Sequence, residues 1–497
     1  MAKGLLITGT SSDAGKSVIT TGIIRMLANL KVSVAPFKGQ NMALNSYVTA
    51  DGHEIGRAQA SQAMAGFVEP SVIMNPVLLK PTSNVESSVL VMGKPYGNYG
   101  AKEYQSLKKE LVEIVDDSFN KLSRQYDVVI AEGAGSPAEI NLLENDLVNL
   151  GFAKRVGLKS ILVGDIDRGG VFASLYGTLE ILPRDLSSLI RGFVINKFRG
   201  DSSLLSTAID HVANRTMVPF LGVVEFCKGL NFDIEDSLGL KGLFSQVGSL
   251  SSDKLIVGVV HLPHISNFTD FEPLAYDGGI QLVLIEAPSD IKGVDVLILP
   301  GTKATVIDLE YLATHEFIEE IISHANKGKG LIGICGGYQM LTREIFDGIE
   351  SRQKVTRGLS LIEATTRFEP GKVLRQVDLS FDITNNEVTA RGYQIHYGKV
   401  YLDSNENSLW YLNESGQSQL IEREGYFLEN VLGTSCHGIF ESAQARDKIF
   451  GGLAGLVGKK YTSTTNFESL RQEYFDRCAD LVERNIGAET IKRFVGI

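Results

Sequence analysis

Short apolar runs rich in β-branched residues alternate with amphipathic stretches through the first half of the chain. The runs lie at Gly4–Gly9, Val32–Pro36, Asp127–Glu132, Ser160–Asp165 and Gly192–Asn196. Between the first two, Lys16–Leu30 places Ile19, Ile23 and Leu27 at helical spacing, which predicts a helix with one face on a sheet. Apolar strands that alternate with helices are typical of a parallel sheet covered by helices. We therefore predict an α/β fold for this half.

A second alternating series begins after residue 253. Its strand candidates are Lys254–Leu262, Asp295–Pro300 and Leu331–Cys335. The stretches Val373–Phe381 and Gly392–Tyr401 instead alternate apolar and polar residues, a pattern that favours antiparallel strands with one solvated face. We predict a second α/β unit with an antiparallel addition at the edge of its sheet.

The length of the chain calls for more than one domain. A chain of 497 residues exceeds what one hydrophobic core usually supports. Gly239–Asp253 is rich in Gly and Ser and lacks periodicity, which indicates a linker. From about Asn466 the sequence is charged, with Leu470, Tyr474 and Cys478 at helical spacing. We predict a first domain over 1–238, a linker over 239–253, a second domain over 254–447, and a helical tail over 448–497 packed on the body.

Composition and charge exclude several classes of protein. The formal net charge of -11 argues against a nucleic-acid backbone as the main partner. The chain shows neither a signal-peptide pattern at its start nor an apolar run of membrane-spanning length. The four cysteines, Cys227, Cys335, Cys436 and Cys478, form no CxxC pair and no disulfide framework. We expect a cytoplasmic protein with small-molecule partners and neither nucleic acid nor membrane, and the sequence leaves its oligomeric state open.

A glycine-rich loop follows the first apolar run. Residues Gly9–Ser17 read GTSSDAGKS, directly before the predicted helix. Such a loop turns backbone N–H groups and a helix N-terminus toward one point, which suits phosphate oxygens. Lys16 would reach the terminal phosphates of ATP, and the Ser17 hydroxyl would help to hold Mg²⁺. The predicted phosphate-binding residues are Gly9, Thr10, Gly15, Lys16 and Ser17.

The loop departs from the usual pattern, which has Gly where this chain has Thr10. The leading glycine lies one residue further out, a spacing found in dethiobiotin synthetase and its relatives. The competing interpretation is a plain glycine turn that caps a helix.

Acidic and amide side chains end the neighbouring strands. Glu132 follows four apolar residues in DVVIAEGAG, and Asn196 ends VIN. A P-loop needs an acidic metal partner at the end of a neighbouring strand, so we predict Mg²⁺ binding by Ser17 and Glu132. The competing interpretations are a solvated carboxylate at a strand end and an ordinary loop asparagine.

The second half contains a strand–turn–helix pattern around a cysteine. In Leu331–Leu341 (LIGICGGYQML), an apolar strand ends at Cys335, a Gly-Gly turn follows, and a helix begins after it. This strand–turn–helix pattern is the elbow that exposes a nucleophile. The helix N-terminus favours a thiolate there. His437 in GTSCHGIFES is the candidate proton shuttle. Backbone N–H groups at Gly336 and in the turn at Gly301 would bind the oxyanion.

This constellation resembles the class I glutamine amidotransferases, which release ammonia from glutamine. The resemblance implies a flavodoxin-like α/β second domain beside a P-loop NTPase-like, dethiobiotin synthetase-like first domain. Relatives often carry a glutamate two residues after the histidine, where this chain has Ile439. The group that orients His437 is therefore unassigned. Glu441 lies nearby but would point differently, and His396 is a further candidate for a structural or glutamine-side role.

Several further stretches resemble the cobyric acid synthase family along nearly the whole chain. They are FKGQNMALNSYVT, GRAQASQAMA, NPVLLKP, EGAGSPAEINL, GDIDRGGVFAS, HISNFTDFEPL and PGTKAT. The resemblance implies ATP- and glutamine-dependent amidation of the b, d, e and g carboxylates of adenosylcobyrinic acid a,c-diamide. Cobalt would arrive only as part of that corrinoid substrate. It also implies that Lys38 binds substrate or phosphate and that Asn196 reads the adenine edge. Asp165 and Asp167 are candidates to contact a metal ion or the corrinoid carboxylates. The competing interpretation is a solvated loop at a strand end.

Other functions compete with this one. Cobyrinic acid a,c-diamide synthase has the same architecture and differs in substrate. A P-loop partitioning or regulatory ATPase would have no elbow cysteine, so Cys335 and His437 argue against it. The intact Lys16, Ser17 and Glu132 argue against a non-catalytic corrinoid-binding protein. Dethiobiotin synthetase corresponds only to the first half.

Overall fold

The computed structural model describes residues 3–82, 85–227, 241–244, 250–351, 354–382, 387–414 and 420–497. The chain forms two compact units and enters each more than once. The first unit consists of Met1–Ala43, Glu54–Asp233 and Arg471–Ile497, and the second of Leu44–His53 and Ile234–Leu470. The predicted boundaries followed the order of the sequence, so they include neither the passage of Leu44–His53 into the second unit nor the return of the C-terminus. Part of the predicted linker lies outside the described residues.

A six-stranded parallel sheet forms the centre of the first unit. Its order is β12 (Phe220–Glu225), β11 (Ile190–Phe198), β10 (Lys159–Asp165), β1 (Gly4–Gly9), β9 (Val128–Glu132) and β2 (Val34–Phe37). Every residue of β1 and β9 is buried, as expected for strands covered on both faces. Because β1 lies between β10 and β9, the loop that follows it is flanked by the carboxyl ends of both. The predicted α/β fold is confirmed.

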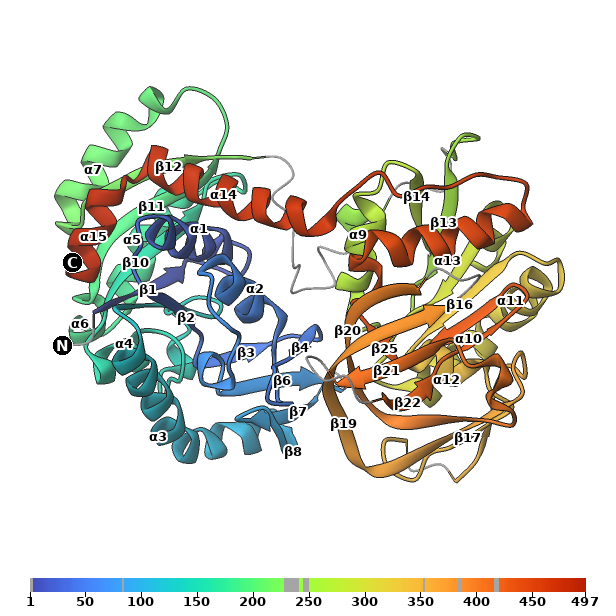
Figure 1. Ribbon diagram of the computed structural model, residues 1–497. Coiled ribbons are helices and arrows are strands. Elements are labelled where there is room, and N and C mark those ends of the chain that lie inside the picture. The colour runs from blue at the N-terminus through green and yellow to red at the C-terminus, as the bar shows by residue number, and fades with distance from the viewer. Residues whose placement is uncertain are drawn as a thin grey trace. The chain divides into compact units, whose positions relative to one another are not determined.

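The C-terminal helices complete the core of the first unit. Apolar residues of α14 (Phe467–Asn485) and α15 (Ala488–Val495), including Phe475 and Val482, share a buried cluster with α1 (Lys16–Asn29) and β1. Figure 1 shows α15 and the adjoining part of α14, in red, beside the blue α1. A Cβ added to Gly22 of α1 would lie 2.4 Å from the carbonyl oxygen of Cys478, so this close packing requires glycine. The first and last segments of the chain thus fold as one unit.

The second unit contains its own parallel sheet. The order is β14 (Ile280–Ile285), β13 (Leu255–Val260), β15 (Val296–Leu299), β16 (Gly330–Ile334), β24 (Val431–Thr434) and β23 (Tyr426–Leu428), of which only β23 is antiparallel to its neighbour. β16 lies inside this sheet and leads into α12 (Gly336–Leu341). The turn between them is therefore held on both sides by buried strands.

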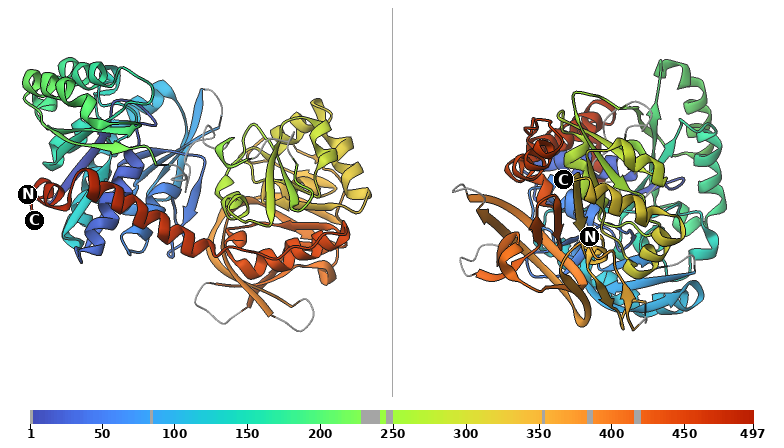
Figure 2. Two further views of the ribbon diagram at one scale, coloured as in Figure 1. Left: turned by 90° about the horizontal axis from the view of Figure 1, so that it is seen from above. Right: turned by 90° about the vertical axis from the view of Figure 1, so that its right-hand side faces the viewer.

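The two stretches with period-two patterns form a separate sheet. They lie in the long antiparallel strands β19 (Ala364–Asp382) and β20 (Glu387–Leu402), which belong to a seven-stranded sheet with the short β25 (Cys436–His437). Figure 2 shows these long strands in orange, to one side of the parallel sheet. The predicted addition at the edge of the parallel sheet is therefore wrong. The α12 helix contacts both β16 and β20, so it separates the two sheets.

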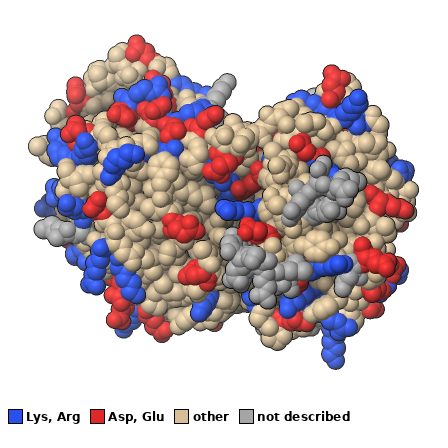
Figure 3. Space-filling view, viewed as in Figure 1, with Lys and Arg blue, Asp and Glu red and all other residues tan. Residues whose placement is uncertain are grey.

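Acidic and basic side chains of the described residues are interspersed on the face of the molecule drawn in Figure 3. Among the described helices, none is long and apolar enough to cross a membrane.

Candidate active site

The glycine-rich loop of the first unit connects a buried strand to a buried helix start. Gly15 has φ 92°, a left-handed conformation that glycine adopts without strain. A Cβ at that position would also lie 1.9 Å from Nδ2 of Asn196. The Thr10 N–H donates to the carbonyl oxygen of Val163 on β10 at 2.9 Å. Backbone geometry and close packing together fix the path of the loop.

Side chains from the loop and the neighbouring strands hold it in place. Lys16 Nζ donates to the carbonyl oxygens of Ser11 at 2.8 Å and Gly135 at 3.3 Å. Asn196 Nδ2 donates to the carbonyl oxygen of Ala14 at 2.9 Å. Asn196 therefore supports the loop from β11, and its expected contact with adenine stays a prediction.

Glu132 is the centre of a buried polar cluster at the end of β9. Its Oε1 accepts hydrogen bonds from Ser17 Oγ at 3.0 Å and Lys38 Nζ at 2.9 Å. Its Oε2 accepts one from Gln62 Nε2 at 2.6 Å. Burial works to raise the pKa of Glu132, but Lys38, Gln62 and Lys16 outweigh it and the pKa is lowered. Glu132 is therefore ionised at neutral pH, and two other predicted residues, Ser17 and Lys38, donate to its carboxylate.

Asp165 and Asp167 lie at the end of β10 and form ion pairs. Lys197 Nζ lies 2.8 Å from Asp165 Oδ2, and Arg199 Nε lies 3.1 Å from Asp167 Oδ1. Asp165 is buried, whereas Asp167 is exposed. The two aspartates thus face basic side chains of β11 and of the residue that follows it, and their expected contact with substrate or metal stays a prediction.

In the second unit, Cys335 occupies a strained turn between β16 and α12. Its φ of 50° with ψ of -106° is unusual for a residue with a side chain. A Cβ on Gly337 would lie 2.0 Å from the carbonyl oxygen of Leu299, and one on Gly336 would lie 2.5 Å from Thr302 Cγ2. The Gly-Gly pair therefore allows β15 and its following turn to approach Cys335. This is the elbow that the sequence predicts.

His437 and Gly301 lie beside Cys335. A Cβ on Gly301 would lie 3.1 Å from His437 Cε1 and 3.8 Å from Cys335 Cβ. The turn that carries Gly301 is fixed by Asp308, which binds the Thr302 hydroxyl and, at 2.7 Å, His264 Nδ1. The structure thus brings together the predicted nucleophile, its proton shuttle and one predicted oxyanion donor.

Asp270 completes a triad that the sequence left open. Its Oδ2 lies 2.7 Å from Nδ1 of His437, and its Oδ1 accepts the Gly438 N–H at 2.8 Å. The aspartate belongs to the short helix η6 (Phe268–Phe271). Its stretch, HISNFTDFEPL, carries family resemblance, but no spacing rule links it to a histidine 167 residues away. Only the tertiary fold identifies the pair.

The environment of His437 favours its charged form. The side chains of His437 and Asp270 are 1% and 5% exposed. Burial favours the neutral imidazole, but Asp270 and a hydrogen bond to Cys335 together raise the pKa of His437 to about 10. His437 is therefore an imidazolium at neutral pH, placed to stabilise negative charge on the Cys335 sulfur.

His396 has a different environment in the same unit. Its Nδ1 lies 2.8 Å from the carbonyl oxygen of Gly398, and its buried Nε2 has no hydrogen-bond partner among the described residues. Burial lowers the pKa of His396 to about 3. His396 is thus a neutral imidazole, and its expected glutamine-side role stays a prediction.

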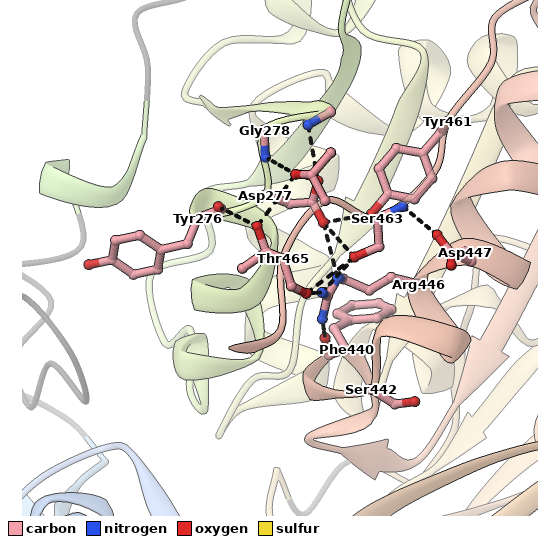
Figure 4. A network of polar contacts seen from close by, with 12 residues as sticks. Tyr276, Asp277, Gly278, Phe440, Ser442, Arg446, Asp447, Tyr461, Ser463 and Thr465 are labelled. Atoms are coloured by element: carbon pink, nitrogen blue, oxygen red, sulfur yellow. Dashed lines mark hydrogen bonds and ion pairs between the residues drawn. The ribbon is translucent and has the colours of Figure 1, made fainter. Parts of the chain in front are cut away.

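A buried ion pair connects the chain segments that follow Asp270 and His437. Arg446 Nε lies 3.3 Å from Asp277 Oδ2, and both side chains are fully buried. Arg446 also donates to the carbonyl oxygen of Phe440 at 2.5 Å, while Asp277 accepts from the hydroxyls of Tyr461 and Ser463. Figure 4 shows these side chains converging from three segments. This network, centred on Asp277 and Arg446, ties the loop of Asp270 to the loop of His437.

The fold, the glycine-rich loop of the first unit and the Cys335–His437–Asp270 arrangement of the second define a class of protein. It is a P-loop nucleotide-binding unit joined to a glutamine amidotransferase. Two family descriptions match the chain, "CobQ/CobB/MinD/ParA nucleotide binding domain" over residues 5–239 and "CobB/CobQ-like glutamine amidotransferase domain" over residues 256–445.

Relatives that match this chain over nearly their full length show which family within this class it belongs to. A cobyric acid synthase of Rhodococcus jostii is 44% identical over 99% of this chain and 95% of its own. The cobyric acid synthase of Syntrophobacter fumaroxidans is 39% identical over 100% and 99%, and that of Vibrio parahaemolyticus is 41% identical over 98% of each. The chain belongs to the cobyric acid synthase family. It is a glutamine-hydrolysing ligase that forms amides.

Proposed function

We propose that this protein amidates the b, d, e and g carboxylates of adenosylcobyrinic acid a,c-diamide and so produces adenosylcobyric acid. Each amide would take its nitrogen from glutamine and consume one ATP. The observation that carries the proposal is the arrangement of Cys335, His437 and Asp270, because it equips the chain to release ammonia from an amide. The full-length relatives support the choice of substrate.

Glutamine hydrolysis would begin at Cys335. The thiolate attacks the side-chain amide carbon, and the N–H groups of Gly336 and Gly301 stabilise the oxyanion. His437 donates its proton to the departing nitrogen, which leaves as ammonia. A thioester then remains on Cys335. His437 then accepts a proton from water, which cleaves the thioester and releases glutamate. Asp270 holds the imidazole by Nδ1 and favours its charged form throughout.

The first unit would activate the corrinoid carboxylate. A carboxylate oxygen attacks the γ-phosphorus of ATP, ADP leaves, and the resulting acyl phosphate has a good leaving group. Ammonia then attacks the acyl carbon, forms the amide and expels phosphate. Lys16 and the backbone N–H groups of Gly9–Ser17 would orient the phosphates. Lys38 would neutralise charge on the transferred group.

Ser17 and Glu132 have the donor chemistry that Mg²⁺ prefers. Their oxygens lie 3.0 Å apart, and the lowered pKa of Glu132 keeps it ionised. Mg²⁺ held by these two side chains would supply positive charge for the phosphoryl transfer. Cobalt enters only within the corrinoid substrate. We also propose that the reaction takes place in the cytoplasm, where ATP and glutamine are available.

A comparison of nitrogen donors tests this function. ADP release is measured with glutamine or ammonia and a panel of corrinoids, in wild type and in Cys335→Ala. We expect wild type to accept either donor with cobyrinic acid a,c-diamide, and Cys335→Ala to accept only ammonia. Turnover with cobyrinic acid instead would favour the a,c-diamide synthase reaction. Corrinoid-independent ADP release would contradict both assignments.

A further inference from the structure

A ten-residue segment from the first half of the sequence is embedded in the second unit. The chain leaves the first unit after Ala43, runs through the second unit as Leu44–His53, and returns at Glu54. We call Leu44–His53 the docked segment. Asn45, Ser46 and Val48 have no solvent-exposed surface. The glutamine amidotransferase match begins only at residue 256, so these residues lie outside it.

Two reciprocal hydrogen bonds join the docked segment to the loop that carries Asp270. Asn45 Oδ1 accepts the Phe268 N–H at 3.1 Å, and Asn267 Oδ1 accepts the Ser46 N–H at 3.2 Å. Asn267 has φ 52° and directly precedes η6, so these bonds fix the turn from which the helix starts. Asp270 is the third residue of η6. Its carboxylate position therefore depends on a turn that the docked segment holds.

The same segment holds the aromatic ring beside His437. Tyr393 pairs with His437 across β20 and β25, and the two rings stack with centroids 5.4 Å apart. The Tyr393 hydroxyl donates to the carbonyl oxygen of Ser46 at 3.2 Å. The ring of Tyr47 lies 5.5 Å from that of Tyr393. The docked segment thus contacts the turn that starts the helix of Asp270, and it contacts Tyr393, the ring that stacks on His437.

We propose that Asn45 and Tyr393 are positioning residues of the glutaminase triad, and that the docked segment orients His437 toward Cys335. The inference rests on the proposed glutaminase function and adds to it a part of the chain outside the amidotransferase domain. A segment with only a packing role could contact any part of the second unit. This one binds the two elements that fix the plane and the Nδ1 side of the imidazole.

The test measures glutamine hydrolysis by full-length variants at saturating and limiting glutamine. Asn45→Ala removes the acceptor for the Phe268 N–H, whereas Asn45→Asp keeps an oxygen there. Tyr393→Phe removes the hydroxyl that donates to the Ser46 carbonyl oxygen while keeping the ring, and it serves if Asn45→Ala fails to fold. Thr49→Val is the matched control, because Thr49 bonds within the docked segment, to His53, and is equally buried.

We expect Asn45→Ala to lower kcat about 10- to 100-fold while KM for glutamine changes little, since the triad rather than the substrate is misplaced. Asn45→Asp should recover most of kcat, Tyr393→Phe should show a smaller loss, and Thr49→Val should match wild type. Wild-type kcat in Asn45→Ala and Tyr393→Phe would overturn the inference, as would an equal loss in Thr49→Val. Cys335→Ser serves as the reference: if it still hydrolyses glutamine, the proposed function itself fails.

Discussion

Asp270 takes the place that a glutamate two residues after the histidine has in many class I amidotransferases. In this chain that position is Ile439, which is buried and apolar. The carboxylate that meets His437 instead comes from η6, and its Oδ2 lies 2.7 Å from Nδ1 of His437. A triad is defined by geometry and role rather than by sequence position. Under the proposed mechanism, a carboxylate from a different segment would therefore serve the same purpose.

Replacement of Asp270 by Asn should separate the electrostatic role of this carboxylate from its size. We expect kcat for glutamine hydrolysis to fall about 10²- to 10⁴-fold. Asp270 raises the pKa of His437, so its loss lowers that pKa and the imidazolium disappears at a lower pH. The alkaline limb of the pH profile of kcat/KM should therefore move to lower pH. Glu441→Gln is the control, and a wild-type profile for Asp270→Asn would refute the assignment.

In the first unit, replacement of Glu132 by Gln tests the proposed magnesium site. Because its Oε1 already binds Ser17 and Lys38, Glu132→Gln should weaken Mg²⁺ binding and misplace both partners. We expect ADP release with ammonia to fall about 10²-fold or more and the Mg²⁺ concentration at half-maximal rate to rise. Asp127→Asn, at the exposed start of the same strand, should leave both unchanged. Equal Mg²⁺ dependence in Glu132→Gln and wild type would exclude a role in metal binding.

At the scale of elements, the network centred on Asp277 and Arg446 connects the segment that follows Asp270 to the segment that follows His437. Removal of one member leaves the other as an uncompensated buried charge. Arg446→Met should lower the free energy of unfolding by about 3–5 kcal/mol, measured by urea denaturation. Arg391→Ala removes an exposed pair with Asp378 and should cost about 1 kcal/mol or less. Similar losses in both variants would mean that the buried network does not stabilise the unit.

The local pattern predicted those elements whose apolar residues lie close in sequence. The strands that end at Gly9, Glu132 and Asp165 appear within a residue of the predicted ranges, as does the elbow at Cys335. Those sites depend on a strand, a turn and a helix that follow one another. The association of β19 and β20 in a separate sheet was not predicted, because period-two alternation fixes neither the partner nor the sheet.

The contacts of Asp270 and Asn45 could not be predicted from one sequence for a related reason. Each residue lies in a short segment whose sequence has no sustained helical or strand periodicity. Its partner is determined by the packing of distant segments: His437 for Asp270, and the Phe268 backbone for Asn45. By sequence pattern alone, Asn45, Asn267 and Asp270 are indistinguishable from solvated turn residues.

At the scale of the whole molecule, the C-terminal segment is an integral part of the nucleotide-binding unit. Gly22 allows α1 to approach the backbone of α14. Gly22→Ala should force these helices apart and cost about 1–3 kcal/mol, seen as a lower melting temperature of the unit. Gly177→Ala is the matched control in α5 (Val171–Ile181), where an added Cβ meets nothing within 4 Å and should be neutral or slightly stabilising. Equal melting temperatures would contradict the close helix packing.

Transfer of isotope from glutamine to product tests the central claim most directly. Wild-type protein is supplied with [amide-¹⁵N]glutamine, unlabelled ammonia, ATP, Mg²⁺ and adenosylcobyrinic acid a,c-diamide, and the product is analysed by mass spectrometry. We predict that wild type introduces the label into the four new amides, in a share set by competition with the unlabelled ammonia that it also accepts. Cys335→Ala should form four unlabelled amides, since only wild type releases the glutamine nitrogen. Labelled product from Cys335→Ala, or wholly unlabelled product from wild type, would contradict a pathway that begins at Cys335.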